Sequence, residues 1–323
     1  MPAATAVAHL DADCFYVSAE RVRDAFLLGK PVAVLGNQGA CVIARSYEMR
    51  AAGVAVAMPI WEAARLCPAG VYIKRDFRWY EALSRAMLAA VRLFSPAVEY
   101  YSIDEFFFEA LPYRGLSLQG TAEAVRDHIL QAVGVPVTVG IARTKTLAKL
   151  ISDTAKPFGA LALLGPDGER DLLAKRPVTD ITGIAGRRAA RLARHGIHTC
   201  LDFARADRRL VRMLLTVVGE RLWYELNGEP AQPLHVRRPP HKMLSRGGSI
   251  GTATADPHRL HAWLVRDLER LVEELEHYGV RAGRLEVCAV YGRRLGKSGA
   301  QALPAPSDRF GPLLEAARRC LRR

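Results

Sequence analysis

The sequence predicts an α+β protein, because its first half mixes strand-like runs with amphipathic helical segments. Runs of β-branched and aromatic residues, typical of strands, occur at Val7–Leu10, Tyr100–Phe108 and Val135–Ala142. The segments Tyr80–Phe94 and Thr121–Val133 instead space their apolar residues as helices do. We therefore expect two amphipathic helices packed on one sheet.

The composition is that of a globular protein with a basic surface. The chain has 323 residues, of which 50% are apolar, enough for two or three domains. Its net charge of +13 indicates a polyanionic partner such as nucleic acid or an acidic membrane surface. The sequence contains no run of about 18 apolar residues and no signal sequence, so we expect neither a membrane span nor secretion. Six cysteines and nine histidines show no metal-ligand spacing, and the cysteines are expected to be small buried groups in a reducing cytoplasm.

Short elements separated by proline and glycine are expected before the first long helix. They are predicted strands at Lys30–Gly36, Gly39–Ala44 and Val71–Ile73, and predicted helices at Tyr47–Ala52 and Met58–Leu66. Further along, Thr121 is a suitable N-cap for its helix. A helix over Thr144–Thr154 carries Lys145 and Lys149.

A turn-rich break at Gly165–Gly168 separates this part from a helical one. Residues from about 169 to 232 are predicted to form small helices with no clear strand. The last part of the chain is predicted to contain a strand at Leu244–Thr252, a helix at Pro257–Tyr278, a strand at Arg284–Arg293 and a helix at Arg309–Arg323.

The stretch Tyr100–Phe108 places Asp104 and Glu105 between two blocks of strand-forming aromatic residues. We predict a β-hairpin with both acids at or beside its turn. Carboxylates flanked so closely by apolar strands need a partner, because unpaired buried charge is costly. A bound divalent cation supplies one.

A second acidic motif, Asp11 and Asp13, follows the predicted strand Val7–Leu10. Two strands that end on carboxylates can lie side by side and direct several oxygens at one point. Hard cations such as Mg2+ prefer oxygen ligands, and a carboxylate cluster with two such ions is a recurring device for phosphoryl transfer. The alternative is that these acids are ordinary turn or cap residues, but the two motifs together favour the metal site.

Two basic segments are candidates for phosphate contacts. Ile181–Leu192 contains a glycine-rich turn followed by arginines, which can present backbone N–H groups and guanidinium groups to a phosphate. An ordinary helix–helix turn is the alternative. Val236–Lys242 is predicted to be an extended linker whose cations lie along a phosphate backbone.

Taken in order, these motifs resemble those of the Y-family (translesion) DNA polymerases over nearly the whole chain. The matching stretches are Asp11-x-Asp13-x-Phe15-Tyr16, Ser102-Ile103-Asp104-Glu105 and Val139–Leu150. Cys41–Arg45 and Thr144–Leu150 look like the UmuC branch, whereas Ser46–Arg50 looks like the DinB branch.

The resemblance implies a right-hand-like polymerase with four domains. These would be a palm of mixed sheet and helices at 1–14 and 78–166, small fingers at 15–77, a helical helix-hairpin-helix thumb at 167–232 and, after a linker at 233–242, an α/β little finger at 243–323. Little fingers of this family usually continue into another strand and often into a tail with a sliding-clamp peptide, so the resemblance implies either a C-terminally truncated form or processivity that comes from elsewhere. No clamp-binding peptide is recognisable in the sequence.

The resemblance also implies an activity, namely template-directed addition of deoxynucleotides to a primer 3′ end by two-metal phosphoryl transfer. The context would be low-fidelity translesion synthesis in an SOS-type response to DNA damage, in the cytoplasm. Implied cofactors are two Mg2+ ions, with Mn2+ as a substitute. Implied partners are primer–template DNA, dNTPs and a sliding clamp or SOS accessory subunits, with no membrane.

Individual residues take their expected roles from the same resemblance. Asp11, Asp104 and Glu105 would be the catalytic metal ligands, with the Ala12 carbonyl completing a coordination shell, and Asp13 would be a local turn acid. The nucleotide would contact Cys14, Phe15, Tyr16, Tyr47, Arg50 and Lys156, and Tyr16 would be the steric gate against a ribose 2′-hydroxyl. DNA would contact Gly183, Ala185, Gly186, Arg187, Arg188, Arg237, Arg238 and Lys242. Ala185 stands where the family commonly has glycine, and alanine lacks the freedom of glycine to adopt positive φ.

Three other interpretations compete with a polymerase. A noncatalytic Y-family-like accessory protein would bind DNA and recruit partners, but such relatives lose metal acids that this chain retains. A simple helix-hairpin-helix DNA-binding module leaves the Asp104–Glu105 hairpin unexplained. A two-metal nuclease would use carboxylates but would not need Tyr47, Arg50 and Lys156 around a triphosphate.

Overall fold

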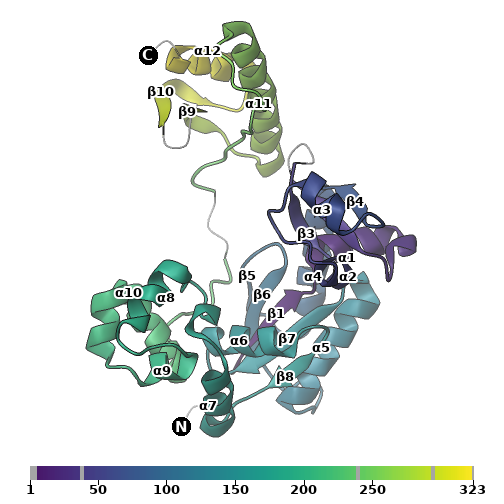
Figure 1. The fold of residues 1–323 in the computed structure, drawn as a ribbon, viewed down its shortest axis with the longest axis vertical. Helices are drawn as coiled ribbons and strands as arrows, with labels where there is room; N and C mark the ends of the chain where they lie inside the picture. The colour runs from purple at the N-terminus through teal and green to yellow at the C-terminus, as the bar shows by residue number, and fades with distance from the viewer. Residues whose placement is uncertain (1–5, 37–39, 238–240, 292–294, 322–323) are drawn as a thin grey trace. The chain divides into compact units, whose positions relative to one another are not determined.

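The protein is described by a computed structural model, which covers residues 6–36, 40–237, 241–291 and 295–321 (Figure 1). The chain divides into two units, residues 1–238 and residues 239–323. Each unit has its own core.

A mixed five-stranded sheet forms the centre of the first unit. In spatial order its strands are β5 (Val98–Tyr100), β6 (Glu105–Ala110), β1 (Ala6–Ala12), β7 (Val137–Ala142) and β8 (Ala160–Ala162). The central strand β1 runs antiparallel to both neighbours, and β8 runs parallel to β7. The predicted hairpin is confirmed, since β5 and β6 pair antiparallel and Asp104 lies in the turn between them.

The two faces of this sheet have different roles. On one face, alternate residues such as Leu10, Phe106 and Phe108 join a buried core with the helices α4 (Phe77–Val91) and α5 (Leu118–Val133). Because side chains alternate across a strand, the neighbouring polar residues point to the opposite face. That face is covered by the helix α6 (Lys145–Ala155).

Glycine allows α6 to approach the sheet closely. A Cβ atom at Gly140 in β7 would lie 2.4 Å from the backbone carbonyl oxygen of Ala148 in α6. Any larger residue would push the helix away from the strands. This contact holds the lysines of α6 close to the acidic residues of β1 and β6.

A smaller α/β layer spans residues 15–74. Its strands, in the order β3-β2-β4, are Val42–Arg45, Val32–Leu35 and Val71–Lys74, and its helices are α1 (Phe15–Arg23), η1 (Ala25–Leu27), α2 (Tyr47–Ala51) and α3 (Ile60–Leu66). Most of these elements match the predicted ones within a few residues.

Helices alone form the rest of the first unit's described regular structure. They are α7 (Pro166–Lys175), η3 (Val178–Asp180), α8 (Gly186–Ala193), α9 (Cys200–Arg205) and α10 (Arg208–Leu226). Their apolar residues form a second core with α6. The helix α10 is interrupted at Thr216, which has non-helical dihedral angles (φ 66°, ψ −166°).

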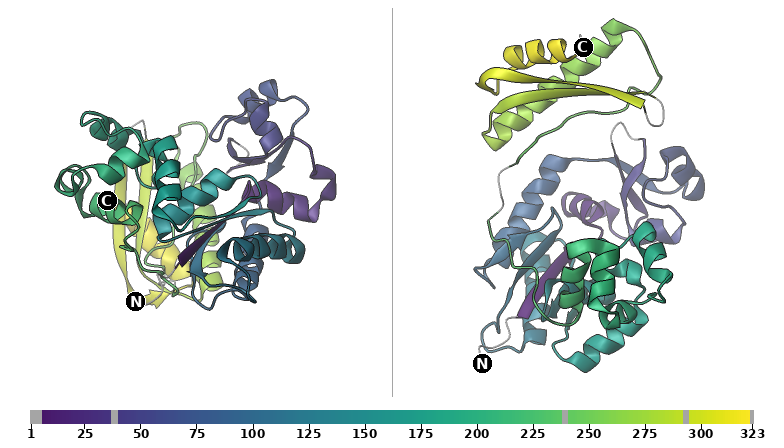
Figure 2. Two further views of the ribbon diagram at one scale, coloured as in Figure 1. Left: turned by 90° about the horizontal axis from the view of Figure 1, so that it is seen from below. Right: turned by 90° about the vertical axis from the view of Figure 1, so that its left-hand side faces the viewer.

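The second unit is a two-stranded antiparallel sheet with two helices (Figure 2). Its elements are α11 (Pro257–Tyr278), β9 (Ala282–Tyr291), β10 (Leu295–Ser307) and α12 (Phe310–Leu321). Leu285 of β9 packs with Ala316 and Ala317 of α12 in a small buried cluster.

The predicted α+β class is confirmed, but several predicted elements are wrong. Residues 244–252 form no strand, since Gly247 and Gly248 interrupt the apolar pattern there. Ser117, not Thr121, caps α5: the Ser117 hydroxyl accepts the Gly120 N–H, whereas Thr121 lies inside the helix. The strands β8 and β10 were not predicted. Of the cysteines expected to be buried, Cys288 is exposed, and Cys14 and Cys41 are only partly buried.

Some predictions lie outside the described residues. These include Arg238 and the predicted element ends Gly39, Arg293 and Arg323. Among the described helices, none has both the length and the apolar character needed to cross a membrane.

Candidate active site

Two acidic residues meet at one edge of the central sheet. Asp11, at the end of β1, lies directly opposite Glu105, at the start of β6. Together with His9 they form a group whose potential ligand atoms lie within 4.8 Å of one another. The antiparallel register therefore brings together two acids that lie 94 positions apart in the sequence.

Asp104 is held beside this pair by the turn that precedes β6. Its backbone carbonyl oxygen accepts the Ala12 N–H at 3.0 Å. Its carboxylate accepts the Ser102 hydroxyl at 2.6 Å, which orients the side chain. The predicted acids Asp11, Asp104 and Glu105 are thus gathered at adjacent strand ends.

A cleft of about 420 Å³ opens over these strand ends. Asp11 and Asp104 line it, as does Ala12, while Glu105 is not part of its lining. All six predicted nucleotide contacts also line it, namely Cys14, Phe15, Tyr16, Tyr47, Arg50 and Lys156. The structure therefore collects side chains from β1, α1, α2 and the segment after α6 around one space.

Lys156 balances the charge of Asp11 at the cleft. Its ammonium lies 2.8 Å from Asp11 and 3.2 Å from Asp153. Burial raises the pKa of the Asp11 carboxyl to about 7, although the nearby Lys156 ammonium lowers it and Glu105 raises it further. Asp11 is thus a poorly solvated carboxylate whose charged form needs a cation.

Glu105 is balanced in the same way by Lys149 of α6, with which it forms an ion pair. His9 Nε2 lies 3.8 Å from the Glu105 carboxylate, and His9 Nδ1 lies 2.7 Å from the Ser152 hydroxyl. Burial, together with the lysines around it, lowers the pKa of His9, so its ring is neutral. The sequence prediction missed His9 and Lys149, although His9 precedes Asp11 by two residues and so shares its face of the strand.

The donor set at the strand ends fits a divalent cation. Carboxylate oxygens are hard ligands, the type that Mg2+ and Mn2+ prefer. Two of the carboxylates already attract an ammonium group each, as expected where negative charge is concentrated in a half-buried site.

Asp13 has different surroundings. Its carboxylate accepts hydrogen bonds from the Thr138 hydroxyl at 3.1 Å and from the Phe158 N–H at 2.8 Å. These contacts tie the end of β1 to β7 and to the segment that carries Lys156. Asp13 is therefore placed to position its neighbours.

An aromatic stack supports the wall of the cleft. The Tyr16 ring stacks on Tyr80 with 4.6 Å between centroids, and the Phe77 ring lies 5.7 Å away. The Tyr80 hydroxyl donates to the buried Glu20 at 2.6 Å. Ser46 caps α2, which contributes Tyr47 and Arg50 to the same lining.

The predicted DNA contacts lie outside the lining of this cleft. Gly183 has φ +90°, and α8 begins at Gly186, so Arg187 and Arg188 are exposed on its first turn. The expected handicap of Ala185 is wrong, because its φ is −92°, which any residue adopts. Arg237 is exposed in the segment after α10, and Lys242 is exposed in the second unit.

Comparison with protein families gives two matches. Residues 10–153 match the impB/mucB/samB family, and residues 241–323 match the C-terminal domain of the same family. The first match contains Asp104, Glu105 and Lys149, but it ends before Lys156.

Individual relatives are similar over most of the chain. The chain is 31% identical over 315 residues to DNA polymerase IV of Bacillus velezensis, covering 96% of this chain and 76% of that protein. It is 32% identical over 325 residues to protein UmuC of Salmonella typhimurium, covering 96% and 77%. A Y-family DNA polymerase chimera of Dbh and Dpo4 has the same fold, with a TM-score of 0.79 over 98% of this chain and 93% of that chain at 22% identity.

Proposed function

The chain belongs to the impB/mucB/samB family and is a Y-family, UmuC/DinB-like DNA polymerase of the translesion class, and from this premise we propose a catalytic mechanism for it. In this mechanism the cleft holds an incoming deoxynucleoside triphosphate, and Asp11, Asp104 and Glu105 hold two Mg2+ ions. The observation that carries the proposal is the register of β1 against β6, which sets Asp11 opposite Glu105 beside the turn that holds Asp104.

The metal ions would supply positive charge at the reacting phosphate and would make the primer 3′-hydroxyl more acidic. Asp11, Asp104 and Glu105 would hold them, together with the Ala12 carbonyl, and Mn2+ could replace Mg2+. Ser102 contributes by fixing the Asp104 carboxylate through its hydroxyl.

The chain's cationic residues would bind the triphosphate. Arg50 can fork onto two phosphate oxygens, whereas Lys156 supplies a point charge. Tyr47 stands beside them in the cleft lining, and Cys14 and Phe15 line the same cleft. Lys156 would exchange its contact with Asp11 for a phosphate oxygen.

Sugar selection would depend on Tyr16. Its ring lines the cleft, and its stack on Tyr80 limits its movement. A rigid ring at this position would collide with a ribose 2′-hydroxyl and thereby favour deoxynucleotides.

Binding of primer–template DNA would involve the basic residues outside the cleft. Gly183, Ala185, Gly186, Arg187 and Arg188 would contact backbone phosphates at the start of α8, as would Arg237, Arg238 and Lys242 on the segment that joins the two units. In domain terms, we assign residues 1–14 and 78–166 to a palm, 15–77 to fingers, 167–232 to a thumb, 233–242 to a linker and 243–323 to a little finger.

The proposed setting is the SOS-type response in the cytoplasm, where a sliding clamp or accessory subunits would support the enzyme. A noncatalytic accessory role is the second candidate. The retention of all three acids at adjacent strand ends, two of them lining a cleft that also contains Arg50 and Lys156, favours catalysis.

Mg2+-dependent primer extension tests the mechanism. The wild type should extend a primed template, and Asp104→Ala and Glu105→Ala should abolish extension while the matched variant Glu109→Ala, on the same strand, retains it. Loss of activity with unchanged folding and unchanged primer–template binding would support the metal-ligand roles. A folded wild type that binds primer–template tightly but never extends it would favour the accessory role.

A further inference from the structure

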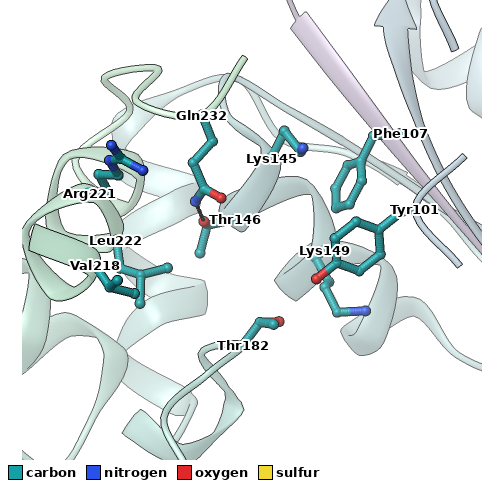
Figure 3. A pocket seen from close by; sticks show the side chains of 10 residues that line it. All are labelled: Tyr101, Phe107, Lys145, Thr146, Lys149, Thr182, Val218, Arg221, Leu222 and Gln232. Carbon is teal, nitrogen blue, oxygen red and sulfur yellow. Dashed lines mark hydrogen bonds between the residues drawn. The ribbon is translucent and has the colours of Figure 1, made fainter. Parts of the chain in front are cut away.

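A second pocket, of about 180 Å³, lies in the first unit, and Lys149, the ion-pair partner of Glu105, is part of its lining (Figure 3). Lys145, Thr146 and Lys149 of α6 form one wall, beside Tyr101 and Phe107. Val218, Arg221 and Leu222 of α10 form another wall, with Thr182 and Gln232 completing the lining. The mechanism proposed above uses none of these residues.

Three cationic side chains line this pocket. It contains Lys145, Lys149 and Arg221 and no acidic side chain. Lys145 and Lys149 are one helical turn apart, so they share a face of α6. Apolar walls and nearby hydroxyl groups complete surroundings in which an anion is both attracted and able to accept hydrogen bonds.

The two lysines differ in how firmly they are held. Lys145 is buried and pairs with the buried Glu99 at 2.7 Å, and its ammonium lies 4.7 Å from the centre of the Phe107 ring. Lys149 is half-buried, and its partner is Glu105. Lys149 therefore links the pocket to a carboxylate that our mechanism assigns to the metal site.

We propose that this pocket binds a phosphate group, and that the bound phosphate draws the Lys149 ammonium away from Glu105 and so frees that carboxylate for a divalent cation. The proposal rests on the proposed function, because it takes Glu105 to be a metal ligand. Its physical basis is competition: the ammonium and the divalent cation both seek the same Glu105 oxygens, and an anion in the pocket gives the ammonium another partner.

This coupling must act in both directions. If the phosphate strengthens cation binding by some factor, the cation strengthens phosphate binding by the same factor. The pocket would thus make the metal site responsive to the presence of a phosphate-bearing ligand. The phosphate could belong to a nucleic-acid backbone or could be a free phosphate, since both offer the same tetrahedral oxyanion.

A titration of the full chain with Mn2+ tests the proposal without relying on activity. Binding is measured as the loss of the free-ion signal in electron paramagnetic resonance. Sulfate serves as the tetrahedral anion, because it binds Mn2+ only weakly, and chloride at equal ionic strength is the control. We expect sulfate to lower the Kd of Mn2+ for the wild type by about fivefold or more.

Matched variants locate the effect. Arg221→Gln should abolish the sulfate effect, whereas Arg209→Gln, an exposed arginine on the same helix but outside the pocket lining, should retain it. Lys149→Gln should bind Mn2+ more tightly than the wild type without sulfate and should not respond to sulfate. Arg50→Gln should keep the response, which separates this pocket from the nucleotide cleft.

The outcomes separate this inference from the proposed function. Mn2+ binding that Glu105→Gln weakens, but that sulfate does not strengthen, would overturn the coupling and leave the metal site intact. Mn2+ binding that Glu105→Gln leaves unchanged would overturn both. If sulfate does strengthen Mn2+ binding, the titration is repeated with a short oligothymidylate in place of sulfate, and its uncharged methylphosphonate analogue is the control. The result shows which source of phosphate the pocket accepts.

Discussion

Asp11 and Glu105 face each other across the antiparallel pairing of β1 with β6, and each carboxylate pairs with a different lysine. Lys156 comes from the segment after α6, and Lys149 comes from α6 itself. The helix α6 and the residue that directly follows it thus supply both counter-charges. The two ammonium groups stabilise the charged forms of two neighbouring carboxylates in a half-buried site, where an unpaired carboxylate would be costly.

The first prediction separates Asp11 from Asp13. Asp11→Asn should lower the rate of single-turnover primer extension by on the order of a thousandfold, because it removes a charged metal ligand. Asp13→Asn should cost only about tenfold or less, since its oxygen can still accept the Phe158 N–H. Equal losses in the two variants would contradict the assignment of Asp11, and not Asp13, as a metal ligand.

The second prediction concerns pH. The raised pKa of Asp11 means that, with divalent cations chelated, the folded protein binds more protons here than the unfolded chain does between about pH 4 and about pH 7. The free energy of unfolding of the wild type should therefore fall, relative to that of Asp11→Asn, as the pH rises through this window. Lys156 stays charged throughout this window, so its attraction for ionised Asp11 is already contained in the Asp11 pKa and adds no further slope. Urea unfolding of both proteins at several pH values measures the difference, and a difference independent of pH would contradict it.

The strands of the site are predicted well from the sequence, because residue types within a short run are enough to indicate a strand. Val7–Leu10 and Phe106–Phe108 are rich in strand formers, and the acids that end the runs stand out against them. The pairing of Asp11 with Glu105 follows once the two strands lie side by side. The helix predicted from about Pro257 to Tyr278 is confirmed, and its ends are marked by Pro257 in the first turn and by Gly279 at the C-cap.

Features that depend on tertiary contacts escaped prediction. His9 meets Ser152 143 positions away, and no local pattern reports that contact. The strand β10 contains Gly296, Gly299 and Pro304, which are poor strand formers, and it is extended because β9 pairs with it. Propensity alone therefore fails where a partner strand imposes the conformation.

The third prediction tests the aromatic stack. Tyr80→Leu should remove the ring that supports Tyr16 and should raise ribonucleotide incorporation relative to deoxynucleotide incorporation, by roughly tenfold. Tyr80→Phe keeps the ring and should leave sugar discrimination nearly unchanged, although it loses the hydrogen bond to Glu20. Competition assays with paired ribo- and deoxynucleoside triphosphates report the ratio, and similar ratios for the two variants would refute the supporting role.

The fourth prediction tests the turn before α8. Gly183→Ala should weaken primer–template binding, because φ +90° is strained for alanine and the turn would shift its arginines. Ala185→Gly should bring no gain, since Ala185 already has an ordinary φ. Fluorescence anisotropy with labelled primer–template measures both. Tighter binding by Ala185→Gly would show that this turn does need the freedom of a second glycine.

The fifth prediction concerns Glu225, a fully buried carboxylate at the end of α10. It accepts the N–H groups of Thr146 at 3.0 Å, Ala231 at 2.8 Å and Gln232 at 3.0 Å. It therefore fastens the start of the segment that leads to the second unit onto α6.

Glu225→Ala should leave three N–H donors without this acceptor and lower the free energy of unfolding of the first unit by roughly 3 kcal/mol. The amides of Ala231 and Gln232 should then exchange with deuterium much faster, because they lose their acceptor. Glu229→Ala, an exposed acid on the same segment, is the matched control and should change neither quantity. Urea unfolding and hydrogen–deuterium exchange measure the two effects, and unchanged exchange at both amides would show that other contacts hold the segment in place.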